Sequence, residues 1–205
     1  MKWAVLISGG GTNLQALIDA VAAGRLSAEL GLVVSNRADA GGLARAAAAG
    51  IPTAVIEHKD FASREEFDKK LVDTLKSHQI EWIALAGFMR VLTPIFLNAF
   101  AGKIVNIHPS LLPSFPGIRA QEQAFESGVK VAGCTVHFVD NGVDTGPIIA
   151  QRAVEVVEED TVETLRQKIL AQEHEIFPAV IHWIDQGFVT IDQKGTRPIV
   201  RLAIP

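Results

Sequence analysis

The first half of the chain alternates between short apolar runs and amphipathic stretches, and this alternation restricts the possible fold most strongly. Five runs have the length and composition of buried strands: residues 3–7, 30–35, 53–56, 82–86 and 103–107. Helical spacing of apolar residues follows the first three runs, and Ser63 with Glu66 forms a capping-box pattern for the third helix. Strands that alternate with helices predict an α/β fold with an open, mostly parallel, doubly wound (Rossmann-like) sheet.

The second half of the chain has a different pattern. Residues 131–139 and 148–157 resemble strands, and the loop 140–147 between them is too short for a helix, which predicts an antiparallel strand pair. A long helix should begin at a capping box formed by Asp160 and Glu163, kink at Pro178 and end at Gly187. Residues 188–191 are expected to add an edge strand to the sheet.

Composition limits the class of protein. The 205 residues predict a single domain, 1–205, and the 48% of hydrophobic residues are enough for a sizeable core. A net charge of -4 gives no basic surface for nucleic acid or an anionic membrane. The apolar runs are too short for a signal peptide or a membrane span, and one cysteine fits a reducing compartment, so we expect a cytoplasmic protein.

An amide and an imidazole stand at the end of the fifth predicted strand. Alternation along a strand places Asn106 and His108 on the same side, and Pro109 keeps the backbone of His108 extended. An amide beside a group that can carry a proton near neutral pH suits the stabilisation of a developing oxyanion. The alternative is a strand end whose polar residues only cap backbone groups.

Three consecutive glycines, Gly9 to Gly11, follow the first strand and precede a helix. Backbone N–H groups at such a position can bind an anion with help from the helix dipole, and Thr12 and Asn13 can bind the same anion or cap the helix. No lysine follows the glycines, so this is not a Walker A loop, and Leu14 replaces the third glycine of a dinucleotide fingerprint. We favour a monophosphate site over a simple tight turn.

The glycine loop, residues 87–92 and residues 106–109 all follow parallel strands. In an open sheet these segments lie at the carboxyl edge, where ligands bind. We therefore expect the phosphate site and the Asn106–His108 pair to share one crevice.

Two carboxylates are open to more than one interpretation. Asp144 lies in a glycine-rich loop and either performs ordinary turn chemistry or orients and charges His108. Glu173 lies on the apolar stripe of the long helix, where it is either paired, facing a ligand, or at the stripe edge. His137 is interpreted as a packed histidine, with a residue that lines the pocket as the alternative. Since no cluster has metal-ligand spacing, we predict no metal.

Taken together, the motifs resemble those of the phosphoribosylglycinamide formyltransferase family, the folate-dependent enzymes of purine synthesis. The resemblance runs from about residue 5 to about residue 187. It is carried by the segments 7–15, 85–90, 106–113, 140–147 and 172–174.

The resemblance implies a role for each matching residue. Asn106, His108 and Asp144 match the catalytic trio. The glycinamide ribonucleotide site corresponds to Gly11, Thr12, Asn13 and Glu173. The folate site corresponds to Arg64, Met89, Arg90, Val91, Leu92, Asn106, Asp140, Asn141, Gly142, Val143 and Asp144. Thr12 replaces a frequent serine, and Leu170 replaces a polar residue that is expected near the substrate.

The implied reaction is direct transfer of the formyl group of the co-substrate 10-formyltetrahydrofolate to the amine of 5'-phosphoribosylglycinamide. The resemblance implies small-molecule partners and a monomer or weak homodimer, without nucleic acid or membrane. The alternatives are a formyltetrahydrofolate deformylase, a methionyl-tRNA formyltransferase, or a non-catalytic phosphoribosyl or folate binding module.

Overall fold

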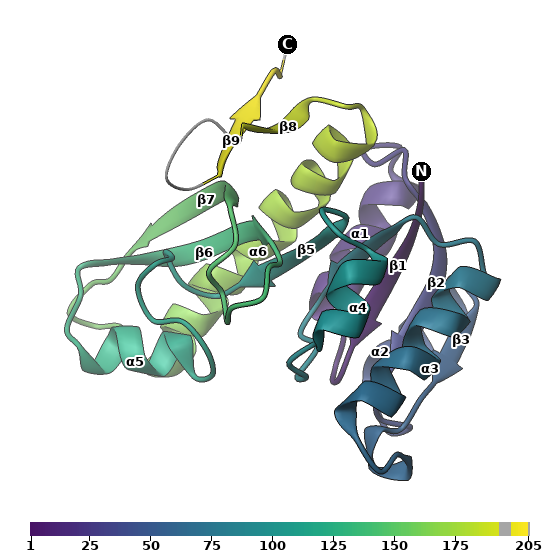
Figure 1. Cartoon of the computed structure of the whole chain (residues 1–205). Coiled ribbons are helices and arrows are strands. Elements are labelled where there is room, and N and C mark those ends of the chain that lie inside the picture. Colours follow the sequence, from purple (N-terminus) through teal and green to yellow (C-terminus); the bar gives the residue numbers. More distant parts are fainter. Residues whose placement is uncertain (193–197, 205) are drawn as a thin grey trace. The chain divides into compact units, whose positions relative to one another are not determined.

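The computed structural model describes residues 1–192 and 198–204, and the chain divides into two compact units, Met1–Asn106 and Ile107–Pro205 (Figure 1). The fold is α/β, with a mostly parallel seven-stranded sheet in the order β3-β2-β1-β4-β5-β6-β7 and a separate antiparallel pair, β8-β9. The predicted fold class is therefore confirmed.

The first unit contains five parallel strands with helices between them. The strands are β1 (Lys2–Ile7), β2 (Glu29–Ser35), β3 (Thr53–Val55), β4 (Trp82–Leu85) and the start of β5 (Ile104–His108). The helices are α1 (Thr12–Ala22), α2 (Gly41–Ala48), the 3-10 turn η1 (His58–Asp60), α3 (Arg64–Ser77) and α4 (Pro94–Ala99). Strand β1 is central, and its residues from Trp3 to Ile7 are fully buried.

Local chemistry sets the ends of these helices. The Ser63 hydroxyl accepts a hydrogen bond from the Glu66 N–H at 3.1 Å, as the capping pattern predicts. The Glu66 carboxylate accepts from the Ala62 N–H at 3.2 Å instead of from Ser63, so only half of the box forms as expected. Gly50, at φ 71°, follows α2 in the left-handed conformation that ends many helices.

The second unit contains the antiparallel pair and the long helix. Its elements are α5 (Ala120–Glu126), β6 (Val131–Phe138), β7 (Ile148–Glu155), α6 (Val162–Asp185), β8 (Val189–Asp192) and β9 (Ile199–Leu202). Strands β6 and β7 pair antiparallel, as predicted, and α6 packs against both of them.

Two details of the second unit differ from the sequence predictions. Helix α6 begins at Val162 with Thr161 as its N-cap, and its capping box joins Thr161 to Thr164, because the Thr164 hydroxyl can reach back to the Thr161 N–H. Strand β8 is not an edge strand of the main sheet, because it pairs with β9. In the described part of the chain, no helix is long and apolar enough to cross a membrane.

Candidate active site

The glycine loop in the first unit has a conformation that only glycine accommodates easily. Gly11 is the N-cap residue of α1 at φ 71°, and no side chain caps this helix end. A Cβ atom on Gly11 would lie 2.6 Å from the Cα atom of Gly42 on α2. Thr12 and Asn13 are the first residues of the helix and are not its cap. The helix therefore presents its N-terminal end at a turn that a larger residue would disturb.

A cation that the sequence analysis did not identify lies beside this loop. Arg45 of α2 donates a hydrogen bond from Nε to the Gly10 carbonyl oxygen at 2.8 Å and another from Nη1 to Oε1 of Gln15 at 3.2 Å. Arg45 and Gly10 are 35 residues apart and only the packing of α2 against α1 brings them together, so no local sequence signal indicated this contact.

The predicted folate segment, residues 89–92, follows β4 in the same unit. The structure brings Arg64 to this segment, because Arg64 Nη2 donates to the Val91 carbonyl oxygen at 2.6 Å. Met89 and Val91 are 68% and 58% exposed, so their apolar side chains are available to a ligand. Leu92 is buried. The predicted residues Arg64 and Val91 therefore lie together, and Arg64 also holds the backbone of the segment.

A buried carboxylate fixes the end of the same segment. Asp68 of α3 is 2% exposed, and its Oδ2 accepts a hydrogen bond from the Thr93 N–H at 2.6 Å. Burial raises the pKa of Asp68, and this effect outweighs the Thr93 hydrogen bond and the charge of Arg64, both of which lower it. The sequence analysis missed Asp68.

Strand β5 carries the predicted amide and imidazole at alternate positions, 106 and 108. His108 is 5% exposed, and its Nε2 lies 2.9 Å from the Phe115 carbonyl oxygen. A carbonyl oxygen only accepts hydrogen bonds, so Nε2 must carry a hydrogen. The other ring nitrogen of His108 is Nδ1, which this carbonyl oxygen does not contact.

Asp144 lies beside that nitrogen. Its Oδ2 is 3.4 Å from Nδ1 of His108 and accepts a hydrogen bond from the Gly117 N–H at 2.7 Å. The backbone of Asp144 is left-handed, at φ 54°, a conformation that non-glycine residues rarely adopt. Burial alone would raise the pKa of Asp144, but interactions with His137, Gly117 and His108 together lower it. The structure therefore places an ionised carboxylate against His108.

His137 is a second histidine neighbour of Asp144. It is 2% exposed, as expected of a packed residue, but its Nε2 lies 3.6 Å from Oδ1 of Asp144. Its Nδ1 is 2.8 Å from the Phe138 carbonyl oxygen. The position on a strand between two apolar residues gave no signal of this contact, which depends on how the 140–147 loop folds.

The remaining predicted residues of the second unit lie in two places. Asp140 Oδ1 accepts hydrogen bonds from the Gly142 N–H and the Thr145 hydroxyl, at 3.0 and 2.7 Å, and Asn141 to Val143 are exposed. Glu173 of α6 is 5% exposed. Burial, together with the negative charge of Glu173, raises the pKa of Cys134 on β6 to about 12.

Each unit therefore contains part of the predicted site. The first holds Gly11, Thr12, Asn13, Arg64, residues 89–92 and Asn106, and the second holds His108, residues 140–144 and Glu173. A common crevice for these two groups stays a prediction. In residues 1–192 and 198–204, no group of three or more His, Cys, Asp or Glu side chains could hold a metal ion.

Comparison with known proteins identifies relatives along most of the chain. The sequence model of the Formyl transferase family matches residues 1–181. The chain is 47% identical, over 88% of its length and 92% of the relative's, to a Bacillus subtilis protein named phosphoribosylglycinamide formyltransferase. It is 52% identical over 93% of its length to the trifunctional purine biosynthetic protein adenosine-3 of Chironomus tentans, of whose length it spans only 14%.

A solved structure shows the same relationship in three dimensions. The crystal structure of glycinamide ribonucleotide transformylase 1 from Symbiobacterium toebii has a TM-score of 0.94 to this chain and 49% sequence identity, and covers 98% of this chain and 93% of its own. The family match and these identities show that the chain belongs to the formyl transferase family, among relatives named phosphoribosylglycinamide formyltransferase.

Proposed function

We propose that this protein transfers the formyl group of 10-formyltetrahydrofolate to the amine of 5'-phosphoribosylglycinamide. The observation that carries the proposal is the contact between Asp144 and Nδ1 of His108, in a chain 47% identical to a protein named for this activity. An ionised carboxylate beside this nitrogen favours the imidazolium, which is the form that stabilises an oxyanion and can donate a proton.

The reaction begins with attack of the glycinamide amine on the formyl carbon. A new C–N bond forms, and the formyl oxygen becomes anionic in a tetrahedral intermediate. Asn106 donates a hydrogen bond to this oxygen, and the positive charge of the His108 imidazolium stabilises it, since Nε2–H of His108 already donates to the Phe115 carbonyl oxygen. The bond from carbon to N10 of the folate then breaks, and the proton lost by the amine passes to N10 through a carboxylate or water. The formyl group moves directly, with no covalent enzyme intermediate.

Separate groups bind the two substrates. The backbone of Gly11, Thr12 and Asn13 binds the phosphate, with the positive charge of Arg45 beside the loop. Glu173 binds the ribose hydroxyls. Folate is held by Arg64, by residues 89–92 with Asn106, and by residues 140–144. The protein acts as one formyltransferase domain, 1–205, a monomer or weak homodimer in the cytoplasm with small-molecule partners.

An assay with purified protein and both substrates tests the proposal. Formylated product should form only when glycinamide ribonucleotide and 10-formyltetrahydrofolate are both present. Release of formate without the nucleotide would instead indicate a deformylase. Binding of both compounds without turnover would indicate a binding module, and either result would overturn the proposal.

A further inference from the structure

We propose that Asn36 is a positioning residue for folate: with Ser8 and His58 it forms a hydrogen-bonded chain that fixes the backbone N–H of Met89. The inference rests on the proposed function, because it assumes that residues 89–92 contact the folate. None of the three side chains is required to touch a substrate.

The chain of hydrogen bonds crosses four neighbouring strand ends. The Met89 N–H, after β4, donates to Ser8 Oγ at 2.8 Å, and Ser8, after β1, donates to Asn36 Oδ1 at 2.6 Å. Asn36, after β2, contacts Nδ1 of His58 after β3 through its Nδ2 at 3.1 Å. The order His58, Asn36, Ser8, Met89 is the order of the strands, β3-β2-β1-β4.

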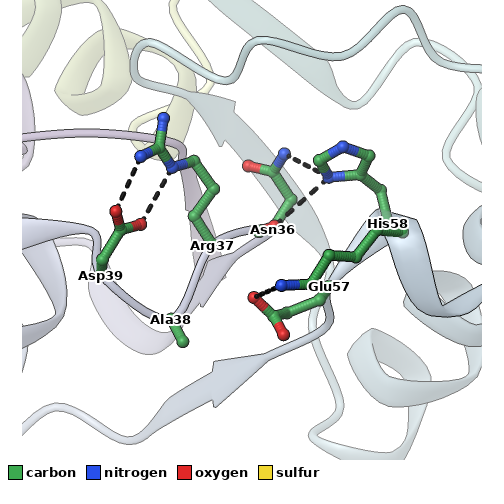
Figure 2. Close-up of a pocket in the computed structure, with 7 residues that line it drawn as sticks. Asn36, Arg37, Ala38, Asp39, Glu57 and His58 are labelled. Carbon is green, nitrogen blue, oxygen red and sulfur yellow. Dashed lines mark hydrogen bonds and ion pairs between the residues drawn. The ribbon is translucent and has the colours of Figure 1, made fainter.

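Every bond in this chain has a defined direction. A backbone N–H only donates, so Ser8 Oγ accepts from Met89 and uses its own hydrogen for Asn36 Oδ1. The amide of Asn36 must then turn its NH₂ group toward His58, and Figure 2 shows the two side chains facing each other. The backbone carbonyl oxygen of Asn36 lies farther from Nδ1 of His58, at 3.4 Å. A change at Asn36 therefore reaches Met89 through a single hydroxyl.

The burial of each residue indicates which hydrogen bonds of the chain contribute most to the position of Met89. Ser8 and Asn36 are 6% and 4% exposed, so water cannot easily replace either of them. His58 is half-buried and lines a pocket of about 450 Å³ with Asn36, Arg37 and Asp39 (Figure 2). Water in this pocket can substitute for the last link. The effect of substitution should consequently be larger at Asn36 than at His58.

The test compares Asn36→Leu with Ser35→Ala. Leucine has about the size of asparagine but can neither accept from Ser8 nor donate to His58. Ser35 is the matched control, because it is fully buried at the end of the same strand. Among the described contacts, its hydroxyl bonds only to the backbone of Arg37, and it donates to the carbonyl oxygen of that residue at 2.8 Å. Both variants lose buried hydrogen bonds, but only Asn36→Leu breaks the chain to Met89.

We expect Asn36→Leu to raise the KM for 10-formyltetrahydrofolate about tenfold and to leave the KM for glycinamide ribonucleotide within twofold. His58→Ala should raise the folate KM by less than threefold, and Ser35→Ala should change neither constant. In the double variant Asn36→Leu/Ser8→Ala, the rise in the folate KM should be close to the larger of the two single-variant rises, because both changes act through the Ser8 hydroxyl. Equal rises in both KM values, or a folate effect in Ser35→Ala, would overturn the proposal.

Hydrogen exchange separates this proposal from the proposed function. In Asn36→Leu the amide of Met89 should exchange at least tenfold faster than in the wild type, whether or not the protein transfers formyl groups. Ser35→Ala should leave that amide unchanged. Unchanged protection of Met89 in Asn36→Leu would show that the chain does not hold this backbone, even in a fully active enzyme.

Discussion

Asp144 Oδ2 lies 3.4 Å from Nδ1 of His108, while the other ring nitrogen of His108 is 2.9 Å from the carbonyl oxygen of Phe115. The imidazole is thus held between an acceptor that requires Nε2–H and a carboxylate that stabilises a proton on Nδ1. This carboxylate is the charged neighbour of the imidazole, which gives the most direct prediction for the reaction.

Asp144→Asn keeps the size of the side chain and removes its charge. We expect kcat to fall by about 10² to 10⁴-fold, the usual range for acid–base assistance. The nucleotide KM should change little, because the phosphate loop is a separate group of residues. Combined with His108→Ala, the loss should be far smaller than the product of the single losses. Multiplicative losses in the double variant would show that Asp144 does not act on His108.

Gly11→Val tests the phosphate loop. The new side chain would have to adopt φ 71° and approach Gly42, so the KM for glycinamide ribonucleotide should rise at least tenfold with folate binding nearly intact. Gly50→Val is the control, because Gly50 has the same φ and an open surrounding at the end of α2. It should lower thermal stability without changing either KM. Equal loss of both ligands in Gly11→Val would indicate misfolding.

Arg45→Met tests whether a positive charge assists the phosphate loop. The nucleotide KM should rise about tenfold, the equivalent of one charge-assisted hydrogen bond of roughly 1.5 kcal/mol, and inorganic phosphate should inhibit less. Arg37→Met is the control, since Arg37 is exposed and paired with Asp39 at 2.7 Å. An unchanged nucleotide KM in Arg45→Met would show that Arg45 does not assist phosphate binding and only holds Gly10 and Gln15 in place.

Glu173→Gln tests the buried carboxylate of α6. Loss of the charged acceptor should raise the nucleotide KM by about tenfold or more and leave the folate KM unchanged. Glu175→Gln, on an exposed position of the same helix, should change neither constant. A change in melting temperature alone would make Glu173 a structural partner.

Asp68 predicts how stability depends on pH. Its pKa is raised in the folded protein, so the folded state binds more protons than the unfolded state between the unfolded and folded pKa values. The contribution of Asp68 to the free energy of unfolding is therefore present below the unfolded pKa and declines as pH rises through the folded pKa. Asp68→Asn retains an oxygen acceptor for Thr93, so its stability relative to wild type should increase with pH across this window in denaturant titrations. A difference in the free energy of unfolding that does not change with pH would contradict a raised pKa of Asp68.

The strands and the glycine loop could be predicted from the sequence because their signals are local. The apolar run of β1 and the glycines after it define a strand and a tight turn without reference to the rest of the chain. Helix α4 was missed although Thr93 and Pro94 stand at its N-cap and first position, a recognisable start signal, because it is only six residues long. Helix α5 begins after Arg119, whose backbone is left-handed, and has no side-chain cap. The local sequence therefore contains no start signal for this helix.

The contacts of the candidate site were less accessible to sequence reasoning. Ser8 and Asn36 are 28 residues apart and Ser8 and Met89 are 81 apart, so only the strand order brings them together. Asp144, which contacts His137, has a left-handed backbone, and aspartate adopts this conformation too seldom for the sequence to predict it. Residue types indicated the chemistry, and the sheet topology determined which groups meet.

The buried thiol of Cys134 makes this protein convenient for spectroscopic labelling. It is the only cysteine in the sequence, and burial raises its pKa to about 12, so the reactive thiolate form is rare at pH 8. A maleimide dye should therefore not react with the wild-type protein, but should react with a cysteine introduced at an exposed position such as Val143. Fluorescence from that position would report on the Asp144 loop as ligands are added, in an otherwise unaltered background.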